Sequence, residues 1–134
     1  MAFKYFLDTH ALIWHLDGNR LLGSNARSII DNPQSQLILP VIGLAEAMFI
    51  VEKGRTAIPA VSDLMHDVAN DPRIDVFPLT LGILDESAAL TSVPEIHDRL
   101  IVATGVYLQK LGDHVEILTK DNEIIVSSIL PVCW

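Results

Sequence analysis

The sequence predicts an α/β domain in which a mostly parallel sheet is covered by helices on both faces. Short apolar segments alternate along the chain with longer segments of helical periodicity, a rhythm typical of βαβ crossovers. The predicted strands are continuous apolar runs, as expected for strands that are buried on both faces. The chain has 134 residues, of which 50% are hydrophobic and 19% charged. This composition favours a single folded domain over residues 1–134.

The N-terminal part predicts two strands separated by two helices. Residues 3–7 form a compact apolar run that ends at Asp8 and is predicted as a strand, and a helix over residues 9–16 follows directly. Ser24 is a favourable N-cap for a second helix, which reaches Ile30 and stops before Pro33. The second predicted strand covers residues 36–39.

The rest of the chain repeats this alternation. Residues 41–53 form a strongly apolar helix closed by Gly54, and residues 59–70 form an amphipathic helix with a proline in its first turn. The remaining predicted elements are a strand over 74–77, helices over 80–91 and 98–111, a strand over 116–118, a short helical turn over 122–126 and a terminal strand over 132–134.

Charge and hydropathy restrict the possible functions. The formal net charge of -8 opposes the electrostatic attraction that most nucleic-acid-binding domains use. The longest uncharged stretch, residues 32–45, is shorter than the roughly 20 apolar residues that a membrane span needs. With no secretory signal recognised either, a cytoplasmic location is expected. The high apolar content also indicates a surface for a partner protein or a second copy of the chain.

Four acidic residues stand where a ligand would bind. Asp8 follows the first predicted strand, Asp121 follows the strand over 116–118, and Asp98 opens a helix. In open α/β sheets, ligands bind beyond the carboxyl ends of the strands. Each aspartate is also a favourable helix N-cap, which is the structural alternative for all three. Glu46 lies inside an apolar helix and caps nothing, so its charge requires a partner, a cation or a narrow solvated stripe.

Carboxylates that converge repel one another unless they are partly protonated or hold a cation. A set made only of carboxylates favours Mg²⁺ or Mn²⁺ over zinc or copper. Such ions activate water and neutralise the charge on a phosphodiester during in-line displacement. Metal-assisted phosphodiester cleavage is therefore the chemistry that fits these four residues.

Four segments, in this order, carry a family resemblance: residues 6–14 (FLDTHALIW), Glu46, residues 94–104 (PEIHDRLIVAT) and residues 118–121 (LTKD), with Trp134 at the end of the chain. They resemble PIN-domain ribonucleases, in particular the VapC-type toxins of bacterial toxin-antitoxin pairs. The resemblance implies a three-layer sandwich with strand order 3-2-1-4-5 and an RNA substrate. It also implies an antitoxin partner that brings Arg or Lys near the acids, and we expect a homodimer.

The same resemblance assigns roles to individual residues. It places the metal ligands and catalytic residues at Asp8, Glu46, Asp98 and Asp121, with hydroxyl support from Thr9 and Thr119. Gly43 departs from the family pattern, because many relatives carry Ser or Thr three residues before the acidic residue of this helix. The departure questions a supporting hydrogen bond to Glu46 but not the metal site.

Few basic or aromatic residues are predicted to contact RNA. Lys53 and Arg55 follow the helix that carries the second acid, and Arg99 follows the third. Their structural alternatives are helix-dipole contacts for the first two and a salt bridge for Arg99. Among the five histidines only His97 is expected near the acids, with a surface role as its alternative. The eight aromatic residues are expected in the core.

Two other functions stay open. A phospho-receiver domain also has an acidic magnesium pocket, but it needs a phosphoacceptor aspartate at the end of the third strand, where this chain has Pro78 and Leu79. A catalytically idle PIN module that only binds a partner protein is the other alternative. The four filled acidic positions argue against it.

Overall fold

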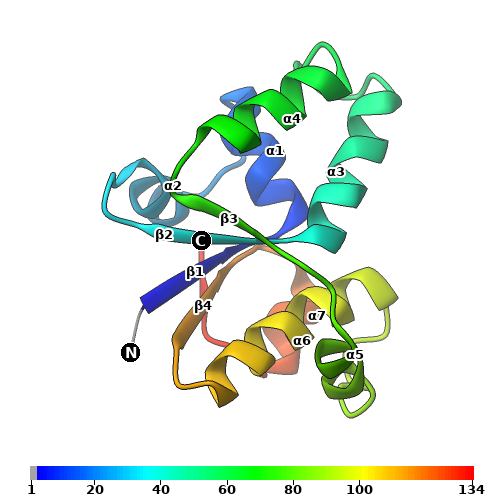
Figure 1. The fold of residues 1–134 in the computed structure, drawn as a ribbon. Helices are drawn as coiled ribbons and strands as arrows, with labels where there is room; N and C mark the ends of the chain where they lie inside the picture. Colours follow the sequence, from blue (N-terminus) through cyan, green and yellow to red (C-terminus); the bar gives the residue numbers. More distant parts are fainter. Residues whose placement is uncertain (1–2) are drawn as a thin grey trace.

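Helices lie on both faces of one sheet in the computed structural model, which describes residues 3–134 (Figure 1). Residues 1 and 2 of the predicted domain lie outside the described residues. In chain order the elements are β1 (Phe3–Leu7), α1 (Thr9–Asp17), α2 (Ser24–Asp31), β2 (Gln36–Pro40), α3 (Val41–Glu52), α4 (Val61–Asn70), β3 (Ile74–Phe77), α5 (Leu81–Ser87), α6 (Ile96–Lys110), β4 (His114–Leu118), α7 (Asn122–Ser127) and β5 (Val132–Cys133). None of the described helices is long and apolar enough to cross a membrane.

The sheet has the strand order β3-β2-β1-β4-β5, and all four neighbouring pairs are parallel. This confirms the predicted order and the predicted mostly parallel sheet. The chain builds outward from β1 to β3 on one side and then crosses to β4 and β5 on the other. The reversal leaves a crevice beyond the carboxyl ends of β1 and β4, where Leu7 pairs with Leu118.

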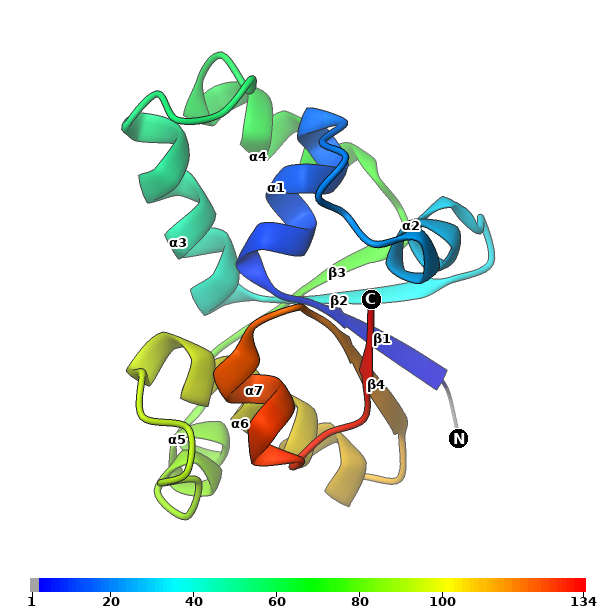
Figure 2. The same ribbon diagram turned by 180° about the vertical axis from the view of Figure 1, so that it is seen from behind.

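Two hydrophobic cores, one on each face of the sheet, make the three layers. In both Figure 1 and Figure 2, α1 to α4 cover one face and α5 to α7 cover the other. Consecutive strand residues enter different cores because side chains alternate along a strand. Leu7 packs with Leu12 and Leu44 in the first core, whereas Phe6 packs with Ile101 in the second. All five side chains are almost fully buried.

Several helix boundaries differ from the prediction. Ser24 is not a cap, because α2 is capped at Gly23 without a side-chain hydrogen bond. Only glycine fits there, since a Cβ atom would lie 2.4 Å from the backbone carbonyl carbon of Trp134. The predicted helix over 59–70 begins later, at Val61, so Pro59 precedes its first turn. The helix predicted over 80–91 is shorter, because α5 is capped by the Thr80 hydroxyl and ends at Ser87.

The helix that carries Asp98 begins two residues earlier than predicted. Its N-cap is Glu95, whose carboxylate accepts a hydrogen bond from the Asp98 amide at 2.9 Å. Asp98 is therefore the third residue of α6 and not its cap. This difference changes the role of Asp98, because its carboxylate is not used to cap the helix in which it lies.

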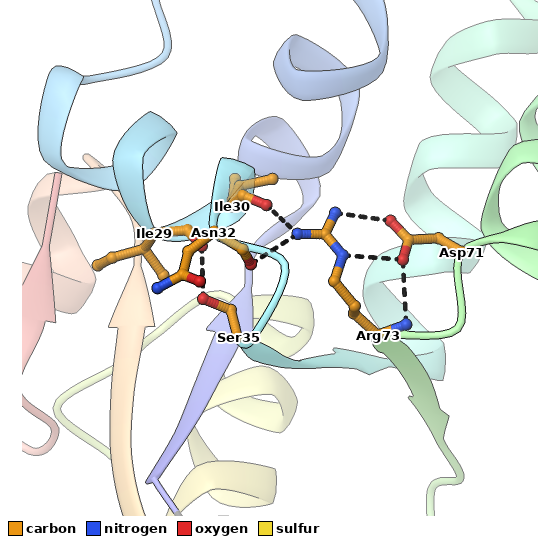
Figure 3. Close-up of polar contacts among 6 residues, drawn as sticks. All are labelled: Ile29, Ile30, Asn32, Ser35, Asp71 and Arg73. Carbon is orange, nitrogen blue, oxygen red and sulfur yellow. Dashed lines mark hydrogen bonds and ion pairs between the residues drawn. The ribbon is translucent and has the colours of Figure 1, made fainter.

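Arg73 ties the start of β3 to the loop that precedes β2 (Figure 3). Its guanidinium forms an ion pair with Asp71 at 2.9 Å and donates to the carbonyl oxygens of Ile30 and Asn32. In the same loop, the Ser35 hydroxyl donates to the Ile29 carbonyl at 2.6 Å. These contacts lie at the amino ends of the strands, away from the crevice. They therefore stabilise the fold and do not occupy the crevice.

Candidate active site

Asp8 and Asp121 are held at the ends of the two central strands by helix capping. The Asp8 carboxylate follows β1 and accepts a hydrogen bond from the Ala11 amide at 2.8 Å. The Asp121 carboxylate follows β4 and accepts from the amides of Glu123 and Ile124 at 2.9 and 3.1 Å. The capping role is thus real for both. Capping uses one oxygen of each carboxylate and fixes the position of the second, which in Asp8 accepts a hydrogen bond from the Thr119 hydroxyl.

Glu46 and Asp98 reach the same place from the two helical layers. Glu46 lies in the middle of α3, and Asp98 lies in the first turn of α6. Together with Asp8 and Asp121 they line one pocket of about 230 Å³. The convergence predicted from the sequence is therefore present, with one carboxylate from each of four segments.

Two threonine hydroxyls orient the acids from behind. The Thr119 hydroxyl donates to Oδ2 of Asp8 and accepts from the Asp121 amide at 3.0 Å. The Thr9 hydroxyl donates to Oε1 of Glu46 at 2.9 Å. Both threonines are buried. The hydrogen bond that the glycine at position 43 put in doubt is therefore supplied by Thr9 instead.

Burial and mutual repulsion shift the pKa values of the carboxyl groups. Burial raises the pKa of Asp98 from 3.8 to about 7, with further increases from Asp121, Glu95 and Glu46. Burial also raises the pKa of Asp8, although the hydrogen bonds from Thr119 and the Ala11 amide act in the opposite direction. A site that disfavours its own negative charge at neutral pH favours a cation among its carboxylates.

The arrangement offers two groups of possible metal ligands. Asp98, Asp121 and Glu123 present oxygen atoms that all lie within 4.8 Å of one another, and so do ligand atoms of Glu46, Glu95 and His97. The first group is made only of carboxylates, which suits a hard divalent cation such as Mg²⁺ or Mn²⁺. The donor set therefore fits the cofactor that the sequence predicted.

Glu95, Glu123 and His10 were not identified from the sequence, whereas His97 was expected near the acids. Glu95 lines the acid pocket, and its Oε1 contacts Nδ1 of His97 at 2.7 Å. His97 lies 3.8 Å from Oε2 of Glu46, so it contacts the site while staying half exposed. The hydrogen bond to Glu95 raises the pKa of His97. His10, which was expected away from the acids, also lines the pocket. The spacing of three between Glu95 and Asp98, typical of a cap and its amide, was the available signal for Glu95.

The predicted basic residues do not line the acid pocket. Arg99 forms no salt bridge within the described residues, and its Nε donates to the Val93 carbonyl at 2.7 Å. Lys53 lies over the ring of Phe49, with 4.6 Å between its Nζ and the ring centroid. It is seven residues beyond Glu46, about 10 Å along the helix axis. Arg55 is exposed just after it.

The comparisons with known structures agree with this fold. A chain in the crystal structure of VapBC2 from Rickettsia felis, bound to a DNA fragment from its promoter, has a TM-score of 0.72 and 13% identity over 97% of both chains. A toxin-antitoxin complex from Klebsiella pneumoniae has a TM-score of 0.69 and 18% identity, over 97% of this chain and 96% of the other. FitAcB from Neisseria gonorrhoeae has a TM-score of 0.66 and 15% identity, over 96% and 95%.

A comparison with curated proteins gives no match. The family model of the PIN domain, in contrast, matches residues 5–129. The matched segment contains all four acids of the pocket, both supporting threonines and the whole of β2, β3 and β4. Because the match extends over nearly the whole chain, this protein belongs to the PIN-domain family.

Proposed function

We propose that this chain is a divalent-metal-dependent endoribonuclease and the toxin of a toxin-antitoxin pair. The observation that carries the proposal is the placement of Asp8, Glu46, Asp98 and Asp121 around one pocket at the carboxyl ends of the central strands. Membership of the PIN family and the likeness of the fold to chains of toxin-antitoxin complexes support it.

In the proposed reaction, water adds across a P–O bond of RNA, and the leaving oxygen departs with a proton. Mg²⁺ or Mn²⁺, when bound, supplies neutralisation of the phosphate charge and activation of water. Asp8, Asp98, Asp121 and Glu46 are the residues that would hold the ion. Asp98 would hold the ion in its ionised form, because a carboxylate must be deprotonated to act as a ligand. The threonine hydroxyls keep the carboxylates of Asp8 and Glu46 in one orientation before the substrate arrives.

The phospho-receiver alternative does not fit this fold. Receiver domains have the strand order 2-1-3-4-5, whereas β3 lies here at the edge of the sheet. The residues after β3 are Pro78 and Leu79, so no phosphoacceptor stands at its carboxyl end. The idle PIN module is the remaining alternative, and a cleavage assay separates it from the nuclease.

The test of the nuclease is cleavage of single-stranded RNA with Mg²⁺ or Mn²⁺ and its loss in EDTA. Asp8→Asn and Asp98→Asn should each lower the rate by roughly a hundredfold or more, because charge and coordination are lost together. Asp63→Asn is the matched control. Asp63 is the third residue of α4, as Asp98 is the third residue of α6, but Asp63 is exposed. Cleavage that persists in EDTA contradicts the metal mechanism. Wild-type rates in both site variants contradict the site.

The partner proposals rest on exposed apolar surface. A pocket of about 360 Å³ next to Glu46 is lined by Ile42, Ala45 and Phe49, and Phe49 is 59% exposed. We propose that the antitoxin covers this face and brings a cation toward the acids. Co-purification of a small basic protein from the native cell tests this partner. Homodimer formation, which light scattering tests, and a cytoplasmic location stay predictions.

A further inference from the structure

A second pocket, of about 260 Å³, adjoins the acid pocket. It is lined by Asp8, His10, Trp14, Lys120 and Asp121. Asp8, His10 and Asp121 also line the acid pocket, so the two pockets are adjacent. Anything that occupies the second pocket therefore lies directly beside the carboxylates. This second pocket is named the Trp14 pocket.

The Trp14 pocket combines an aromatic surface with a positive charge. Nζ of Lys120 lies 4.9 Å from the centroid of the Trp14 ring. The His10 ring lies on another side of Trp14, with 5.3 Å between the ring centroids, and the Trp134 ring packs on Trp14 edge-on at 5.8 Å. Trp134 itself is held against Gly23, where no side chain fits. The aromatic group is thus fixed from behind, while His10 and Lys120 are exposed. Trp14 and Trp134 also pack against the first core, as expected of aromatic residues. Phe3 and Phe49 depart from that expectation, because they are 49% and 59% exposed.

An aromatic ring and a lysine side by side are the two contacts that a nucleotide in a single strand uses. The base stacks on the ring and the phosphate binds the cation. The base can take the place of the lysine on Trp14, because stacking of a base is stronger than a cation–π contact at an exposed site. The released ammonium group then remains within reach of a phosphate, since the lysine side chain is long and flexible.

We propose that the Trp14 pocket binds the nucleotide next to the scissile phosphate of a single-stranded RNA, with its base on Trp14 and His10 and its phosphate on Lys120. The position relative to the scissile phosphate rests on the proposed nuclease function. The pocket adds a positive charge where the four carboxylates otherwise repel the strand. Among the described residues, Lys120 is the only lysine or arginine in the lining of either pocket.

The charge of Lys120 favours RNA over the partner protein as the occupant. The antitoxin is expected to approach the acids with Arg or Lys, and Lys120 repels such a group. An RNA phosphate, in contrast, is attracted to Lys120 and repelled by the acids unless a cation is bound. Lys120 therefore favours an RNA phosphate over a cationic side chain of the antitoxin in the Trp14 pocket.

The test is the affinity of a short fluorescein-labelled single-stranded RNA, measured by anisotropy in EDTA over a series of salt concentrations. Lys120→Gln should weaken binding at least about threefold, and it should reduce the slope of log K against log salt by about 0.7, the value for one phosphate contact to a single strand. Lys110→Gln is the matched control. It removes the same charge at the far end of α6, about 18 Å along the helix from Asp98.

The stacking contact is tested separately. Trp14→Leu should weaken binding about fivefold or more, whereas Trp14→Phe, which keeps an aromatic ring, should retain most of the affinity. An RNA with one abasic position should bind the wild type more weakly and should bind Trp14→Leu no more weakly than the intact RNA does. If Trp14→Leu does not fold, the abasic RNA with the wild type and Trp14→Phe gives the same answer.

Equal effects of Lys120→Gln and Lys110→Gln, or equal wild-type affinity for intact and abasic RNA, overturn the proposal. So does a Lys120→Gln variant that loses affinity for the antitoxin and not for RNA. The binding measurement needs no cleavage, so its failure is separable from failure of the nuclease. If RNA binding depends on Trp14 and Lys120 but no cleavage occurs, the proposed nuclease function is contradicted. If the protein cleaves RNA while Lys120→Gln and Trp14→Leu bind RNA as the wild type does, only the present inference is contradicted.

Discussion

The burial of Asp98, together with repulsion from the neighbouring acids, gives the strongest test of the acid cluster, because its effect on stability can be measured without RNA. In the folded protein the pKa of Asp98 is raised from 3.8 to about 7. A raised pKa means that the folded state binds the proton more tightly than the unfolded chain does. The contribution to stability is therefore fully present below about pH 4 and is lost as the pH rises through about 7. Asp98→Asn removes this loss, because asparagine imitates the protonated carboxyl at every pH.

The size of the expected difference in stability follows from the shift in the pKa of Asp98. About three pKa units correspond to roughly 4 kcal/mol if the full interaction is felt. Asp98 is only half-buried, so solvent screens the repulsion, and we expect about 1–2 kcal/mol. For a chain of this length, that difference is about 3–6 °C in Tm. Without metal, the Tm of Asp98→Asn should equal that of the wild type near pH 4. Near pH 8 it should be higher than that of the wild type by about 3–6 °C.

The assay is a series of thermal melts in EDTA from about pH 4 to about pH 8, repeated with Mg²⁺. Metal should reverse the order at pH 8, because a ligand at a hundredfold excess over Kd stabilises the wild type by about 2.7 kcal/mol and the variant much less. Asp63→Asn again controls for loss of an acid in a first helical turn. A constant difference in Tm between Asp98→Asn and the wild type at every pH would refute the raised pKa of Asp98 and, with it, the burial of this carboxyl group among the other acids.

Three further substitutions test individual contacts. Thr9→Val should lower the free energy of unfolding by about 1 kcal/mol, since the hydroxyl that donates to Glu46 is lost, and Thr9→Ser should retain it; urea denaturation measures both. His97→Gln should destabilise the protein below about pH 6, with the difference disappearing as the pH rises above the raised pKa of His97, as urea denaturation across pH would record. Arg73→Met should cost about 2–3 kcal/mol, and Arg73→Lys should recover only part of it, because an ammonium group lacks the forked geometry; thermal unfolding compares the two.

The local sequence accounts for most of the framework. The bounds of β1 and β3 are those predicted, because short apolar runs limited by polar residues leave little choice of register. Asp8 and Asp121 were placed correctly, since a residue between a strand and a helix is positioned by local backbone geometry and by capping. The helix stop at Gly54 is also local, because its φ of +67° suits glycine.

The start of α6 shows where local reasoning failed. Asp98 is a better N-cap than glutamate by residue type, yet Glu95 caps the helix. The α6 helix gains its first turn because it packs between α5 and the sheet, where Ile101 and Val102 are buried. Packing of the whole helix outweighed the preference of one capping position, and as a result the Asp98 carboxylate faces the acid pocket.

The sequence by itself determined the alternation of strands and helices and which carboxylates stand at the carboxyl ends of the strands, because both follow from elements only a few residues long. The strand order was predicted only through the resemblance to PIN domains. Tertiary structure alone decided which distant side chains meet them. Thr9 donates to Glu46 across 37 residues, and Thr119 donates to Asp8 across 111. Lys120 lies over Trp14 in the same way. These pairs depend on how α1 and α3 pack above parallel strands that are far apart in the chain. The periodicity within a single helix or strand does not specify the distance in space between side chains of different elements.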